Sequence, residues 1–95
     1  MNLSFFTTSN WSKASDEDRK NALQELENYF AGMQGRAPRT VTPKRLDKDV
    51  NGEYRPSEPS KIFISEGLLK NDKDNFEAME TIIHEGRHAY QDDCI

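Results

Sequence analysis

The sequence predicts an α+β fold: an N-terminal helix, a small antiparallel sheet and a C-terminal helix, in that order. Three observations favour it. Apolar residues recur at helical spacing in the first third of the chain, four prolines interrupt residues 36–60, and a second helical pattern follows a short β-rich segment. Helices and strands that fall into separate blocks are typical of this class, and 95 residues are enough for one domain.

The first helix has clear start and stop signals. Ser15 is a good N-cap, and Asp18 three residues later completes a box-like signature. Gly32 or Gly35 ends the helix, and Pro38 prevents its continuation. One apolar stripe is expected to face the core, formed by Ala22, Leu23, Leu26, Tyr29, Phe30 and Met33.

The proline-rich segment predicts short strands, because no helix survives such spacing of prolines. Strands are expected around Arg39–Thr42 and Lys48–Val50. Asn51-Gly52 would then form a two-residue hairpin turn that returns through Glu53–Arg55. Lys61–Ser65 is the strongest strand candidate in the chain.

The second helix is expected to begin near Asp74, which with Glu77 has the spacing of an N-cap and its N3 partner. Gly67 would end the strand before it. The side of this helix expected to be buried carries Phe76, Met79, Ile82, Ile83, Ala89 and Tyr90.

Within this helix the residues His84-Glu85-Gly86-Arg87-His88 spell HExxH. Four residues make about one helical turn, so both imidazoles project from one face and can reach the same Zn²⁺. Glu85 would lie beside the metal and take a proton from a bound water. The competing interpretation is a solvated helix face that carries two histidines. Gly86 costs about 1 kcal/mol against alanine, which favours either a close packing contact or room for a substrate backbone.

The segment Thr81–Gln91 resembles the active-site helix of zincin metallopeptidases. Its HExxHxxQ pattern resembles the small zincin-like domains of bacterial polymorphic toxin systems, and the likeness extends over about Gly52–Gln91. The resemblance implies a zinc-dependent metallopeptidase-like domain. Zinc would be held by His84 and His88, Glu85 would be the catalytic base, and a strand at the edge of the sheet, Ile62–Ser65, would bind a peptide or protein substrate.

In zincins a third ligand follows later in the chain, and here only seven residues follow His88. Gln91 also replaces the glycine of the metzincin pattern. Asp92 or Asp93 could turn back toward the metal if the helix ended at Gln91. The other candidate ligands are Glu58, Glu66 and Asp72, and the candidates for stabilising an oxyanion are Arg87 and Tyr90. We therefore expect residues 1–95 to be a single zincin-like domain, incomplete at its C-terminus and derived from a larger parent protein.

Two alternatives remain open. The chain could be a non-catalytic zincin-like fragment that acts as an interaction module, as a homo-oligomer or as part of a secreted bacterial effector. It could also bind calcium, because the residues from Asp47 to Glu58 satisfy the EF-hand loop pattern. Prolines on both sides remove the helices that such a loop needs, and the Asn-Gly hairpin explains the same residues more simply.

Composition narrows the partners and the location. The net charge is −4, and residues 51–95 carry ten acidic and five basic side chains, which favours cations and disfavours nucleic acid. No apolar run reaches membrane-spanning length. The segment Met1–Trp11 does not have the pattern of a signal peptide, so we expect a cytoplasmic protein or export by a signal-independent route.

The core should be thin. Leu, Ile, Val and Phe together make up just under a fifth of the residues. Cys94 is the only cysteine, so no internal disulfide adds stability. Stability is expected to be marginal unless a metal or a partner contributes to it.

Overall fold

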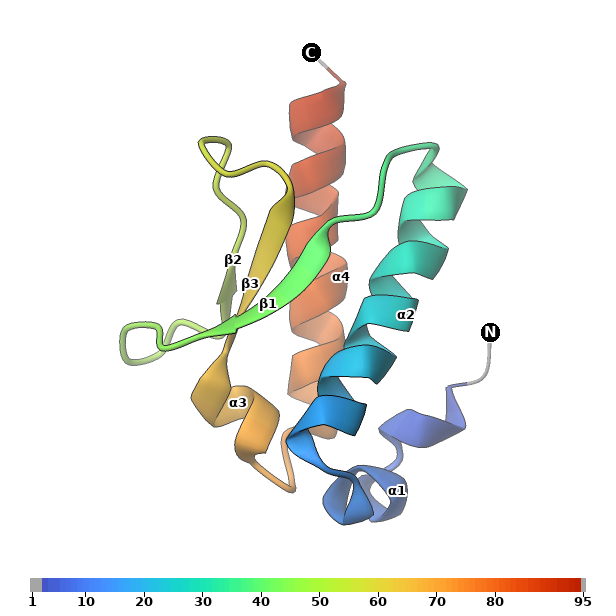
Figure 1. Ribbon diagram of the computed structural model, residues 1–95, viewed down its shortest axis with the longest axis vertical. Coiled ribbons are helices and arrows are strands. Elements are labelled where there is room, and N and C mark those ends of the chain that lie inside the picture. Colours follow the sequence, from blue (N-terminus) through green and yellow to red (C-terminus); the bar gives the residue numbers. More distant parts are fainter. Residues whose placement is uncertain (1–2, 95) are drawn as a thin grey trace.

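The computed structural model describes residues 3–94, which form helices and one small sheet (Figure 1). The elements are η1 (Ser4–Phe6), α1 (Thr8–Lys13), α2 (Asp16–Gln34), β1 (Thr40–Lys44), β2 (Gly52–Glu53), β3 (Lys61–Ser65), α3 (Glu66–Lys70) and α4 (Asn75–Asp93). The predicted α+β class is confirmed. None of the helices in this part of the chain combines the length and apolarity needed to cross a membrane.

Helix α2 begins and ends where the sequence predicts. The Ser15 hydroxyl accepts a hydrogen bond from the Asp18 amide at 3.1 Å. Gly35 ends the helix in the left-handed conformation, with φ of 66°, which glycine adopts without strain. The apolar stripe is narrower than expected: Tyr29 and Met33 are exposed, so the prediction of burial was wrong for these two residues.

The sheet is mixed, with strand order β1-β3-β2. β1 runs parallel to β3 along its whole length, from Thr40 opposite Lys61 to Lys44 opposite Ser65. β2 pairs with β3 antiparallel, with Gly52 opposite Ile64. The expected antiparallel arrangement therefore applies only to the second pair, because the chain crosses to the far side of β3 before it forms β2.

Two expectations about the strands were wrong. The turn lies before Asn51-Gly52: Asp49 has φ of 68°, the Val50 amide donates to the Asp47 carbonyl at 3.1 Å, and no strand forms over Lys48–Val50. Aspartate tolerates this left-handed conformation, so the chain turns there, and Gly52 is left to enter β2. The segment Ile62–Ser65 is not an edge strand, since β3 lies between β1 and β2.

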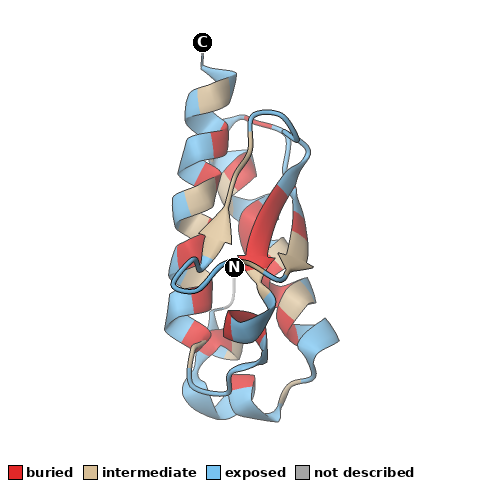
Figure 2. Ribbon diagram, turned by 90° about the vertical axis from the view of Figure 1, so that its left-hand side faces the viewer, coloured by how far each residue is buried: buried red, intermediate tan, exposed pale blue. Residues whose placement is uncertain are grey.

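The sheet and the helix pair α2–α4 form two layers, and their contact surface holds the core (Figures 1 and 2). Ile62 and Ile64 of β3 are fully buried in the core cluster that includes α2 and α4 residues. Phe63 alternates to the opposite face of the strand, where Lys44 Nζ and Arg55 Cζ lie 4.9 and 5.0 Å from its ring centre. Other fully buried core residues are Trp11, Leu23, Leu26, Val41 and Ile82.

Helix α4 runs unbroken to Asp93, and Asp74 is its N-cap residue. The Asp74 side chain makes no cap hydrogen bond, so the expected cap with Glu77 is not formed in full. Phe76 and Tyr90 are 54% and 41% exposed, which contradicts their predicted burial. The buried side of α4 is made largely by smaller residues, Ala78, Thr81, Ile82, Gly86 and Ala89.

Candidate metal centre

The exposed face of α4 brings the imidazoles of His84 and His88 together. Their Nε2 atoms lie 3.2 Å apart, and the ring planes meet at 84°. The His84 side chain is 66% exposed, so the pair is open to solvent. A neutral imidazole has one ring nitrogen with a free lone pair, so at this distance the two nitrogens can share one proton or bind one cation.

Glu85 lies beside the histidines and is much less accessible, with its side chain 12% exposed. Its Oε2 atom is 3.9 Å from Nε2 of His84. The ligand atoms of the three residues all lie within 4.8 Å of one another. Within residues 3–94 no other three His, Cys, Asp or Glu side chains converge in this way.

The two imidazoles fit a zinc ion. Tetrahedral coordination with Zn–N bonds of about 2.0–2.1 Å needs two ligand nitrogens about 3.3 Å apart. The observed separation of 3.2 Å between the Nε2 atoms agrees with this value. Two imidazoles leave further coordination positions for a carboxylate, water or substrate.

Asp92 and Asp93 do not turn back toward the histidines, because α4 continues through both residues. The Tyr54 hydroxyl donates a hydrogen bond to Oδ2 of Asp92 at 2.6 Å. Arg39 pairs with Asp93 at 2.7 Å, and this hydrogen bond holds the pKa of Asp93 below its usual range. These contacts hold both carboxylates along the helix, and because α4 does not end at Gln91, the condition under which one of them could curl back is not met.

The carboxylates proposed from other parts of the chain are also outside the group. Asp72 pairs with Arg19 at 2.7 Å. Glu66 opens α3, and Glu58 lies in a turn closed by its amide and the carbonyl of Arg55. Of the described residues, two imidazoles and one carboxylate therefore make up the candidate centre.

Strand β2 passes close over α4 at Gly52. A Cβ atom there would lie 2.4 Å from Thr81 Cγ2 and 2.9 Å from the carbonyl oxygen of Phe63, so no larger residue fits without a shift. Glu85 lies directly beyond, 3.5 Å from the same point. The glycine thus lets the strand approach the motif, and this is the close approach that places β2 beside the candidate centre.

Two cavities open on either side of this crossing, and Gly52 and Glu85 line both. We call the first the His84-side cavity; its volume is about 470 Å³, and it extends toward the loop before β2. We call the second the His88-side cavity; its volume is about 520 Å³, and it extends toward the end of α4. His84 lines the first cavity and His88 the second, and we call the two cavities together the groove along β2.

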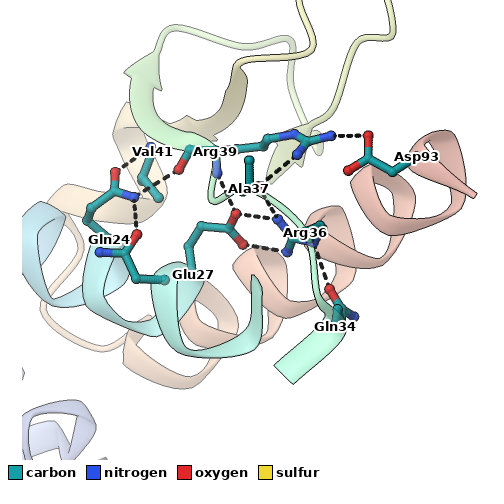
Figure 3. A network of polar contacts seen from close by, with 9 residues as sticks. Gln24, Glu27, Gln34, Arg36, Ala37, Arg39, Val41 and Asp93 are labelled. Carbon is teal, nitrogen blue, oxygen red and sulfur yellow. Dashed lines mark hydrogen bonds and ion pairs between the residues drawn. The ribbon is translucent and has the colours of Figure 1, made fainter. Parts of the chain in front are cut away.

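Gly86, inside the motif, faces a buried ion pair. Glu27 of α2 accepts two hydrogen bonds from Arg36, at 2.6 and 2.8 Å, and the two side chains are 1% and 2% exposed (Figure 3). A Cβ atom at Gly86 would lie 2.8 Å from Nη2 of Arg36 and 3.2 Å from Oε1 of Glu27. Of the two explanations left open by the sequence, the close packing contact is the one observed.

The same ion pair anchors the start of β1. Glu27 also accepts a hydrogen bond from the Arg39 amide at 2.7 Å, and Gln24 bonds both the Arg39 carbonyl and the Val41 amide (Figure 3). Arg39 then reaches Asp93 at the far end of α4. One polar network thus ties α2, the entry to β1 and the motif helix together.

Sequence reasoning missed Tyr54, which lines the His88-side cavity with Glu85 and His88. Burial of the phenol and its hydrogen bond to Asp92 raise the pKa of Tyr54, so it keeps its proton at neutral pH. The sequence did contain one indication of this role: Tyr54 lies two residues after Gly52, and alternate residues of an extended chain lie on the same side.

Arg87 and Tyr90, named as oxyanion candidates, line neither cavity of the groove. Arg87 instead borders a separate cavity of about 240 Å³ beside Gly86, on the α2 side of the motif helix.

The calcium pattern between Asp47 and Glu58 does not form a loop around one point. Gly52 pairs with β3, so β2 separates the two ends of the pattern (Figure 1). No three of its carboxylates converge among the described residues.

Comparison with known proteins adds no assignment: no family model, no curated protein and no solved structure matches this chain. The chain is an α+β protein in which the helix that carries HExxH, α4, lies against the edge strand β2.

Proposed function

We propose that this protein binds zinc through His84 and His88 and hydrolyses peptide bonds with Glu85 as the general base. The observation that carries the proposal is the 3.2 Å separation of the two Nε2 atoms, with a largely buried carboxylate 3.9 Å away. This arrangement combines two ligands that zinc favours with a proton acceptor.

Bound zinc would supply a Lewis acid, which polarises a carbonyl and makes a coordinated water more acidic. Glu85 accepts the proton of the attacking water and passes it to the leaving amine. Its low exposure limits competition from bulk water for that proton. Tyr54 keeps its proton, but its single O–H is donated to Asp92, so its hydroxyl would have to leave Asp92 to donate to the carbonyl oxygen as negative charge develops there.

The resemblance to zincins suggested Ile62–Ser65, in β3, as the edge strand that binds the substrate. The sheet order favours β2 for this role. β3 is paired on both sides, whereas β2 is bonded only to β3 and has a free edge. That edge runs beside the groove, because Gly52 and Glu53 line it together with Glu85. In this proposal β2 holds the backbone of an extended substrate.

The test is metal content, measured by mass spectrometry on protein purified without chelator. We expect about one zinc per chain in the wild type, and the same in Glu66→Gln, whose carboxylate lies outside the centre. We expect the metal to be lost in His84→Ala/His88→Ala. A wild type that takes up no zinc even when zinc is added contradicts the proposal.

The catalytic part has its own test. Glu85→Gln should retain zinc and lose at least about 100-fold in the rate of peptide hydrolysis, because the amide cannot accept the proton. Full hydrolysis by this variant would contradict the role of Glu85 as base. Loss of zinc in this variant would instead make Glu85 a ligand.

A second function is favoured by exposed apolar side chains on α2 and α4. Tyr29, Met33 and Phe76 are 46%, 67% and 54% exposed, and Tyr29 lines a cavity with Leu3, which is 52% exposed. Apolar exposure of this kind is typical of an interaction module. Light scattering tests it: a concentration-dependent dimer that Met33→Glu abolishes supports the module, and a monomer at every concentration contradicts self-association.

A further inference from the structure

The two halves of the groove differ in how their charges are balanced. Glu53, which lines the His88-side cavity, accepts hydrogen bonds from Arg55 outside the cavity lining at 2.6 and 3.0 Å, and Tyr54 donates to Asp92. The hydrogen bond from Arg55 holds the pKa of Glu53 below its usual range. Each acidic group that this cavity adds to Glu85 therefore already has a partner.

The His84-side cavity has carboxylates without such partners. Asp49, Glu77, Glu80 and Glu85 line it, and no Lys or Arg does. The carboxylates of Asp49, Glu77 and Glu80 form no ion pair or side-chain hydrogen bond with any residue between 3 and 94. Glu77 gains some stability from the positive end of the α4 dipole, but Asp49 and Glu80 lie outside the first turn of that helix.

The placement of these carboxylates suits an elongated cation better than a metal ion. Ligands of one ion must converge on a point, and in the described chain only His84, Glu85 and His88 do so. Asp49 comes from the loop before β2, whereas Glu77 and Glu80 come from the first turns of α4, so the negative charge is spread along the cavity wall. Val50 and Thr81 add apolar surface that a hydrocarbon stem can cover.

The His84-side cavity also lies directly beside the candidate centre. Glu85 lines both cavities, so a chain laid along β2 passes through one, over the centre and into the other. Alternate residues of an extended chain point the same way, about 6.6 Å apart. A side chain in the His84-side cavity therefore belongs to a residue within about two positions of the bond at the centre.

We propose that the His84-side cavity binds the Lys or Arg side chain of an extended peptide, next to the bond that is cleaved. This inference rests on the proposed function, because it assigns a substrate class to the same groove. The uncompensated charge of Asp49 and Glu80 attracts the cationic group. A Glu at the same peptide position would be repelled.

Binding is measured by fluorescence anisotropy with zinc-loaded Glu85→Gln protein, which cannot cleave the probe. The probes are labelled ten-residue peptides of Ala and Thr that differ at one central position: Lys, norleucine or Glu. We expect the Lys peptide to bind at least tenfold more tightly than the norleucine peptide, and the Glu peptide to bind most weakly. The difference should shrink with added salt.

Added Asp49→Asn and Glu80→Gln changes should remove the preference for Lys. Both residues are exposed, and asparagine tolerates the left-handed backbone of Asp49, so the fold should be kept. The matched control is Glu58→Gln, which removes an exposed carboxylate outside the groove and should leave the tenfold ratio unchanged. Equal binding of the Lys and norleucine peptides overturns the inference, and so does a Lys preference that survives the two groove substitutions.

Cleavage of the same peptides by wild-type protein separates this inference from the proposed function. A Lys preference in binding without any cleavage supports the cationic site and contradicts hydrolysis. Cleavage at equal rates for all three peptides supports hydrolysis and overturns the cationic site. Calcium that binds in the cavity at millimolar concentration and is lost in the groove variants, with no Lys preference, also overturns it.

Discussion

At the scale of single residues, the middle of the HExxH motif is determined by a partner 59 positions earlier in the chain. Gly86 leaves space for the Glu27–Arg36 ion pair, which is almost fully buried. A buried pair of this kind is costly to break, because removal of one partner leaves an uncompensated charge. The motif helix therefore keeps its position partly through a residue that has no side chain.

Gly86→Ala should destabilise the protein even though alanine is the better helix former. Helix propensity contributes about 1 kcal/mol in favour of alanine, but overpacking against a hydrogen-bonded guanidinium typically costs about 1–3 kcal/mol. Urea unfolding should therefore give a lower free energy of unfolding than that of the wild type.

The matched control is Gly32→Ala in α2, where an added Cβ would meet nothing within 4 Å. This change should raise the free energy of unfolding by up to about 1 kcal/mol. Equal stabilisation by both substitutions would contradict the packing role of Gly86.

At the scale of the elements, what the sequence predicted well was local. The ends of α2 follow from Ser15 and Gly35, and β3 has the bounds read from its β-branched and aromatic residues. The face shared by His84 and His88 follows from one helical turn. Each of these depends on neighbours within about four residues, which periodicity and capping describe.

Pairings between distant segments could not be predicted in this way. The parallel partner of β3 comes from β1, some twenty residues earlier, and the sequence contains no signal for that choice. The Asn51-Gly52 hairpin was a reasonable local prediction, but the turn at Asp49 and the pairing of Gly52 with Ile64 replaced it. Tyr54 was missed for the same reason, because its partner Asp92 lies 38 positions away. Glu27 and Arg36 are only nine positions apart, but they pair across the end of α2, which helical periodicity does not describe.

The N-caps of the two long helices, α2 and α4, offer a test at this scale. Ser15→Ala should lower the free energy of unfolding by about 1 kcal/mol, because its hydroxyl accepts the Asp18 amide. Asp74→Ala should cost roughly half as much or less, since the Asp74 side chain makes no cap hydrogen bond and contributes only through the helix dipole. Urea denaturation of both variants compares them, and a larger loss for Asp74→Ala would contradict the capping assignment.

At the scale of the whole molecule, one core cluster joins the sheet, α2, α3 and α4 with Phe6 and Trp11 of the N-terminal segment. A small core makes the free energy of unfolding sensitive to any ligand that binds the folded state alone. Zinc at 100 times its dissociation constant should add about 2.7 kcal/mol and raise the melting temperature by several degrees.

The zinc effect is measured by thermal unfolding at increasing metal concentration, with His84→Ala/His88→Ala as the control. The control should show no shift. A shift of equal size in the control would mean that the metal binds somewhere else.

Acid should weaken two ion pairs, the one between Arg39 and Asp93 of α4 and the one between Arg55 and Glu53 of β2. The hydrogen bonds from Arg39 and Arg55 lower the pKa values of Asp93 and Glu53 in the folded state. Their contribution to stability is therefore complete above the ordinary carboxyl pKa of about 4 and is lost as the pH falls through the lower folded values.

This contribution is isolated by urea unfolding of wild type and Asp93→Asn/Glu53→Gln between pH 6 and about pH 3. The wild type should lose more stability over this interval than the variant. Identical pH profiles would contradict the role of these two ion pairs.

The contact between Gly86 and the Glu27–Arg36 pair also has an evolutionary consequence. Within any lineage that keeps this fold, positions 27, 36 and 86 should change together and not one at a time. A chain that replaces the ion pair by smaller uncharged residues gains the space for alanine or serine in the motif, and it then also gains helix propensity. We therefore expect glycine at position 86 in the related sequences that keep the ion pair, and larger residues at that position in those that have lost it.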